Sequence, residues 1–347
     1  MNRSKTFDIM KAIAIFFVVL GHVCASYNIQ DGIIAITYFT RMPLFFFVSG
    51  YFLEKSISKY STKSLLKKKF VSLVLPYFIW SAVAFLVNVG MALISDVGCN
   101  KEWIISEFVE VFIHARSVWY LIVLFLTDVI YILLKKNRVP LLMIGIVWIL
   151  LAFLIPGKIF NLYKFKWLFP FFVLGGLFCG NEHMNLIETI KKYTKDRLVL
   201  QAIVGLVLFF ILDIVLYKEP YFTEYTEFRY SSGQSVLWGL VFYAISIWGI
   251  AVWMQIAYVI QNRITKIGSF VSDLLVMCGE FSLDIYLIHM MFMKIIPLDL
   301  RELSVGNGLT VLALVYAFII IMLIAIISKY VLCKIPIYRM VTGRIRL

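Results

Sequence analysis

Charged side chains are scarce in this sequence. Asp, Glu, Lys and Arg together make up 15% of the 347 residues, whereas hydrophobic residues make up 62%. A soluble domain carries about a quarter charged residues, so this composition excludes an ordinary soluble protein. The mean hydropathy of +0.92 indicates a chain that enters a membrane many times.

Cysteine patterns, repeats and linkers are also lacking. The five cysteines are scattered and form no CxxC or Cys/His ligand spacing, which argues against a metal site and against a disulfide framework. No low-complexity tract divides the chain, and only a short basic tail follows Tyr330. We therefore predict a single integral-membrane domain over residues 1–347, with no separate soluble domain.

The net charge of +13 is strongly positive, but the basic residues are dispersed among short loops. Membrane topology accounts for such a distribution, and the sequence contains no nucleic-acid-binding motif. Nucleic acid is therefore not an expected partner.

Apolar runs of membrane-spanning length predict an all-α polytopic membrane protein with about ten transmembrane helices. A partly apolar stretch at 257–279 leaves room for an interfacial or re-entrant helix, and therefore for nine or eleven spans. The runs lie at about 7–27, 33–53, 70–95, 117–134, 139–156, 168–180, 198–217, 234–256, 280–296 and 309–330.

Most Lys and Arg residues fall on one side of the membrane when the N-terminus is placed inside. Because cytoplasmic loops carry an excess of basic residues, both termini are predicted to be cytoplasmic. The expected location is the cell membrane, plasma or inner, with several passes.

The first apolar run contains two ionisable residues, Lys11 and His22. Such groups inside a span are costly and are by default functional candidates. Eleven helical residues make about three turns, so the two side chains share one face roughly 16 Å apart. Asp8 precedes Lys11 by three residues, a spacing that lets their side chains pair.

Five ordered segments resemble one family. They are DIMKAIAIFFVVLGH around Lys11 and His22, TRMPLFFFVSGYF at 40–52, KKKFVSLVLPYF at 67–78, VWYL at 118–121 and FSLDIYLIH at 281–289. Together they resemble the acyltransferase-3 family of integral-membrane O-acyltransferases, especially the branch that acts on surface polysaccharides. Many members carry Arg in place of Lys11, His in place of Arg41 and a second Arg in place of Ser72.

The resemblance implies a membrane O-acyltransferase, most simply an O-acetyltransferase. It would move an acyl group from cytoplasmic acyl-CoA to a sugar hydroxyl of a cell-surface polysaccharide or its lipid-linked precursor. Acetyl-CoA or another acyl-CoA is then a co-substrate, and no permanently bound cofactor is expected.

Acyl transfer needs a base for the hydroxyl proton and a donor for the charge that develops on the carbonyl oxygen. The candidate catalytic residues are His22 as base and Arg41 as charge stabiliser. A histidine that bonds a neighbouring helix is the alternative for His22. For Arg41 the alternative is a structural ion pair with Glu280, Asp284 or another carboxylate.

The phosphates of coenzyme A need cations. The candidates for acyl-CoA binding are Lys11, Lys69 and Lys68, with Asp8 and Ser49 as supporting residues. Lys11 alternatively extends its ammonium to the lipid headgroups, and topology alone can explain the basic cluster that includes Lys68 and Lys69.

The acceptor-side candidates are His289, Tyr286, Trp119 and Tyr120. Tyr286 and His289 share a face with Ser282 in the predicted ninth span. The alternatives are a histidine at headgroup level and an interfacial aromatic belt. Tyrosines and carboxylates of the outer loop 218–233 are a further candidate surface for carbohydrate.

Two other functions are compatible with buried charges in a helical bundle. One is a transporter or flippase for a polysaccharide or a lipid-linked sugar, although no inverted repeat is visible in the sequence. The other is a non-catalytic membrane partner of a synthase. Consumption of acyl-CoA distinguishes the enzyme from both.

Overall fold

A computed structural model describes residues 5–27, 29, 38–95, 99–154, 159–180, 198–217, 233–263, 266–295 and 308–342. Helices of α, 3₁₀ and π type account for all regular structure in these ranges, and they contain no strand. The predicted all-α class is confirmed for this part of the chain.

The chain divides into two compact units. The first comprises Met1–Phe52, Phe171–Tyr225 and Tyr230–Val331, and the second comprises Leu53–Pro170, Thr226–Arg229 and Leu332–Leu347. Two helices, α3 (Arg41–Ile57) and α9 (Tyr163–Gly180), pass from one unit into the other.

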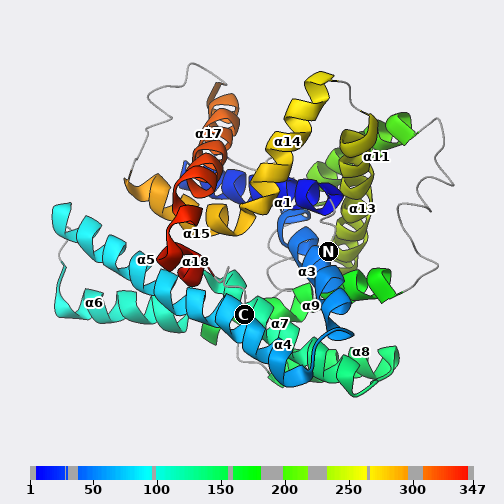
Figure 1. Ribbon diagram of the computed structural model, residues 1–347, viewed down its shortest axis with the longest axis horizontal. Coiled ribbons are helices and arrows are strands. Elements are labelled where there is room, and N and C mark those ends of the chain that lie inside the picture. The colour runs from blue at the N-terminus through cyan, green and yellow to red at the C-terminus, as the bar shows by residue number, and fades with distance from the viewer. Residues whose placement is uncertain are drawn as a thin grey trace. The chain divides into compact units, whose positions relative to one another are not determined.

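Helix α1 is central to the first unit, because it packs against four other helices of that unit (Figure 1). Most of its residues are buried, including both ends of the apolar run. Helices α11 and α13 pack along each other in the same unit. The helices that lie wholly in this unit are α1 (Lys5–Ser26), α11 (Leu198–Leu216), α13 (Gly233–Arg263), α14 (Lys266–Glu280), α15 (Ser282–Ile295) and α17 (Leu309–Tyr330).

The second unit is built on one long helical segment that contains a π turn. Helix α4 (Thr62–Lys69) continues through η1 (Phe70–Val74) into α5 (Leu75–Ile94). Its other elements are α6 (Lys101–Phe108), the π segment η2 (Val109–Ile113), α7 (Trp119–Lys136), α8 (Leu141–Leu154), η3 (Ile159–Asn161), η6 (Leu332–Lys334) and α18 (Pro336–Val341).

A helix overlaps each of the ten predicted runs, but fewer helices are long and apolar enough to span a membrane alone. Among the described residues, six qualify, or seven if a bent pair is one span. The six are Lys5–Ser26, Thr62–Ile94, Ile159–Cys179, Val199–Leu216, Val236–Gln261 and Leu309–Lys334. Ten spans and cytoplasmic termini therefore stay predictions.

The bent pair changes the description of the predicted ninth span. The apolar helices Phe270–Glu280 and Ser282–Lys294 meet at an angle of 76°. Most of the stretch 257–279 is helical, its first part as the end of α13 and its remainder as α14. The part from Phe270 onward forms a broken span or re-entrant unit with the helix that begins at Ser282. The predicted run 280–296 is itself one helix, α15, and the re-entrant alternative that the sequence leaves open for 257–279 is compatible with the bend.

Glycines let helices meet backbone to backbone in the first unit. A Cβ atom at Gly279 of α14 would overlap the backbone carbonyl of Asp8 in α1. Similarly, a Cβ at Gly50 of α3 would overlap the carbonyl of Phe172 in α9, and one at Gly175 would overlap that of Phe47. Close approach through small residues is typical of helices packed in membranes.

We expect Gly279→Ala to destabilise the protein by about 1–3 kcal/mol, because the added methyl forces α1 and α14 apart. Thermal unfolding of the purified protein in detergent measures the change. The matched control is Gly90→Ala on α5, where a Cβ meets no atom within 4 Å. That control should be neutral or stabilising, since alanine is the better helix former. Equal unfolding temperatures for the two variants would contradict the packing role of Gly279.

Candidate active site

Helix α1 carries Lys11 and His22 on one uninterrupted helix, as the sequence predicts. The ammonium of Lys11 lies 2.7 Å from the carboxylate of Asp8, which is buried. The predicted Asp8–Lys11 pair is therefore confirmed. The backbone carbonyl of Asp8 lies against Gly279 of α14, so the ion pair is located where α1 and α14 pack together.

The structure brings two predicted site residues together. The rings of His22 on α1 and His289 on α15 have their centroids 5.2 Å apart, at an interplanar angle of 41°. Tyr286, one turn before His289, lies 6.2 Å from the ring of His289. Residues that are 267 positions apart in sequence thus form one cluster of two imidazoles and a phenol.

The hydrogen bonds of His289 fix which of its nitrogens carries the proton. Its Nδ1 lies 2.9 Å from the carbonyl oxygens of both Ile285 and Tyr286. Because a carbonyl oxygen only accepts, Nδ1 is the protonated donor and Nε2 of the neutral ring carries the lone pair. His289 is 1% exposed, and its Nε2 has no hydrogen-bond partner in the described part of the chain. Within the described residues, the basic nitrogen of His289 is therefore not engaged by a hydrogen bond.

Arg41 lies at the start of α3, beside aromatic rings. Its guanidinium carbon is 5.8 Å from the centroid of Tyr38, and the Tyr38 ring lies 5.3 Å from that of Tyr217 at the end of α11. In the ranges that the structure covers, no ion pair joins Arg41 to Glu280 or Asp284. Ser49 lies on the same helix, directly before the tight contact at Gly50.

The predicted donor-site lysines of the second unit are engaged by other groups. Lys69 Nζ lies 3.0 Å from Asp128 on α7, and Lys68 Nζ lies 5.1 Å from the ring centroid of Tyr60. Their ammonium groups are thus held by an anion and by an aromatic face.

The second unit also contains the aromatic acceptor-side candidates, at the start of α7. The rings of Trp119 and Tyr120 are nearly perpendicular, with centroids 6.4 Å apart. Lys164 Nζ lies 3.9 Å from the Trp119 centroid, so one face of this indole is occupied by a cation. Tyr120 is buried. The outer loop at 218–232 lies outside the described residues.

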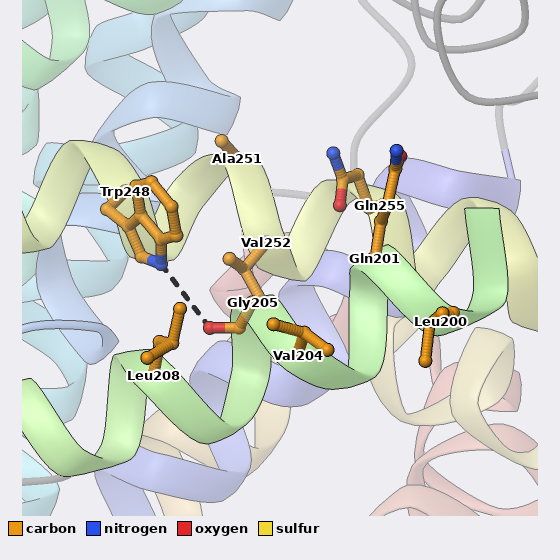
Figure 2. Close-up of a pocket in the computed structure, with 9 residues that line it drawn as sticks. All are labelled: Leu200, Gln201, Val204, Gly205, Leu208, Trp248, Ala251, Val252 and Gln255. Atoms are coloured by element: carbon orange, nitrogen blue, oxygen red, sulfur yellow. Dashed lines mark hydrogen bonds between the residues drawn. The ribbon is translucent and has the colours of Figure 1, made fainter. Parts of the chain in front are cut away.

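A groove of about 490 Å³ lies between α11 and α13 (Figure 2). The indole of Trp248 donates to the carbonyl of Gly205 at 3.3 Å, and the amides of Gln201 and Gln255 lie at the other end of the groove. None of the predicted site residues lines it. In the part of the chain that the structure covers, no three His, Cys, Asp or Glu side chains are arranged to hold a metal ion.

Comparison with protein families matches residues 5–330 to the acyltransferase domain family. The chain belongs to the acyltransferase-3 family. The match extends over both units, so the family assignment applies to the histidine pair and to the lysines of α4 alike.

A curated relative of this acyltransferase-3 chain is the nodulation protein NolL of Mesorhizobium japonicum. The two are 27% identical over 185 residues, which cover 51% of this chain and 48% of NolL. The matched region is thus about half of the relative's length. No solved structure matches the chain.

Two buried carboxylates of this acyltransferase-3 chain are not among the site residues predicted from the sequence. Asp128 on α7 and Asp213 on α11 are both fully buried. Both lie in apolar runs, so the rule that singled out Lys11 and His22 would also have found them. The partner of Asp128 depends on how α4 and α7 pack, and the sequence does not contain that information.

The contact between His22 and His289 predicts a cross-link. After the native cysteines are replaced by serine, a variant with His22→Cys and His289→Cys should react with a short bifunctional thiol reagent. Mass spectrometry of the digest should find the peptides of α1 and α15 joined. The two single-cysteine variants are the controls, and absence of the joined peptide despite labelling of both thiols would contradict the pairing.

Proposed function

We propose that this protein transfers an acyl group, most simply acetyl, from cytoplasmic acyl-CoA to a sugar hydroxyl. The acceptor in this proposal is a cell-surface polysaccharide or its lipid-linked precursor. Membership of an acyltransferase family supports the reaction class. The observation that carries the site assignment is the contact between His22 and the buried His289, whose ring centroids lie 5.2 Å apart.

In the proposed reaction a histidine of this pair removes the proton of the sugar hydroxyl. The hydroxyl oxygen bonds to the thioester carbonyl carbon, the carbon–sulfur bond breaks, and the leaving thiolate of coenzyme A takes up the proton. General-base catalysis of this kind contributes about 10²–10⁴-fold to the rate. An alternative route has His22 carry the acyl group transiently before the acceptor attacks.

The roles of the two histidines follow from their surroundings. His289 is held through Nδ1 by two carbonyl oxygens, so its free Nε2 is suited to accept a proton within the pair. His22, which is less buried, is the residue we assign to the substrate. In the proposal Lys11, roughly 16 Å away along α1, belongs to the acyl-CoA end, and Arg41 stabilises the carbonyl oxygen during attack.

We expect His22→Ala to reduce acyl transfer at least 100-fold, because the base is lost. NMR and mass spectrometry of the surface polysaccharide measure base-labile acyl esters in cells with the wild-type gene, the variant or no gene. The matched control is His114→Ala, since His114 pairs with Glu110 at 2.9 Å in the second unit. That variant should keep its esters at equal membrane abundance.

Near-normal esters in a folded His22→Ala variant would contradict the catalytic role. Polysaccharide that is unmodified and made in full amount in all strains would contradict the acyltransferase reaction on this acceptor. Loss of exported polymer without loss of esters would instead favour a transporter or flippase.

A further inference from the structure

The ion pair between Lys69 and Asp128 involves a carboxylate that is completely buried. Asp128 is 0% exposed on its side chain, Lys69 is 23% exposed, and their charged atoms lie 3.0 Å apart. Neither carboxylate oxygen of Asp128 has a hydrogen-bond partner in the described residues, so the ion pair with Lys69 is the contact that compensates its charge there. A buried carboxylate needs compensation, so Asp128 depends on the ammonium of Lys69.

Lys69 also makes a hydrogen bond through its backbone carbonyl, in addition to the ion pair of its side chain. Lys69 is the last residue of α4 and is followed directly by the π turn η1. The hydroxyl of Ser72, within that turn, donates to the carbonyl oxygen of Lys69 at 3.3 Å. Single π turns within helices occur frequently at functional sites. Lys69 is therefore held at its carbonyl by Ser72 and at its ammonium by Asp128.

A second ion pair on the same helix α7 provides a comparison. Lys135 Nζ lies 3.0 Å from Glu54, but these side chains are 30% and 15% exposed. The hydroxyl of Tyr131 also donates to Glu54 at 2.8 Å. Glu54 thus has two partners and more access to solvent, so loss of its charge should matter less than loss of the charge of Asp128.

We propose that Asp128 is a positioning residue for the acyl donor. It fixes the ammonium of Lys69 so that a phosphate of coenzyme A meets a cation already in place. An ammonium has three N–H donors, and Asp128 engages it on one side while Lys69 keeps part of its surface accessible. This inference rests on the proposed function, because it takes acyl-CoA to be the donor.

The variant Asp128→Asn distinguishes two explanations of coenzyme A binding: positioning of the Lys69 ammonium by Asp128, and simple attraction between the phosphates and positive charge. The variant keeps Lys69 and adds one net positive charge, so attraction alone predicts equal or tighter binding of coenzyme A. Positioning predicts weaker binding, with a Kd about tenfold higher. Calorimetric titration of the purified protein with coenzyme A, without acceptor, measures this Kd. In turnover assays KM for acyl-CoA should rise by a similar factor, with kcat changed less.

Glu54→Gln is the matched control, since it neutralises the carboxylate of the comparison pair and should change Kd less than twofold. Unfolding temperatures are measured for every variant. Lys69→Met combined with Asp128→Asn removes both charges and should regain stability relative to Asp128→Asn alone, while binding of coenzyme A stays weak.

The outcomes distinguish the inference from the proposed function. Equal Kd values for the wild type and Asp128→Asn overturn the positioning role alone. Recovery of tight coenzyme A binding by the double variant also overturns it, because the pair is then only structural. A folded wild-type protein that binds no coenzyme A contradicts the proposed donor, and the inference falls with it.

Discussion

Hydrocarbon offers no hydrogen-bond partner, and each polar group that enters the bilayer must find one within the protein. This constraint explains the main polar contacts of the chain. Asp8 pairs with Lys11 one turn later, Asp128 pairs with Lys69, and Nδ1 of His289 donates to backbone carbonyls. Nε2 of His289 is one of the few buried polar atoms of the described residues that have no hydrogen-bond partner, and it is the atom to which we assign proton transfer in the proposed reaction.

Close backbone contacts make these polar arrangements rigid. Because Gly279 has no side chain, α14 approaches the carbonyl of Asp8 directly, and the sharp bend between α14 and α15 follows immediately. Helix α15 then turns back to place His289 beside His22. Both helices of the bent pair pack against α1.

The candidate residues for the proposed acyl transfer are divided between the two units. The first unit holds the histidine pair, Lys11 and Arg41, while the second holds the lysines of α4 and the aromatic residues at the start of α7. This division parallels the requirements of acyl transfer, in which a base acts on the hydroxyl and cations bind the phosphates of the donor. Within the second unit Lys69 forms an ion pair with Asp128, whereas Lys63 and Lys67 form no ion pair among the described residues.

Composition and spacing by themselves determined the membrane class, the helical character and the pairing of Asp8 with Lys11, because each depends on hydropathy or on neighbours along one helix. The ordered motifs also indicated the family. Tertiary structure alone decided that His22 meets His289, that Asp128 engages Lys69, and that the predicted ninth span is bent from the helix before it. Those contacts join residues far apart in sequence, and helix packing, which hydropathy does not encode, brings them together.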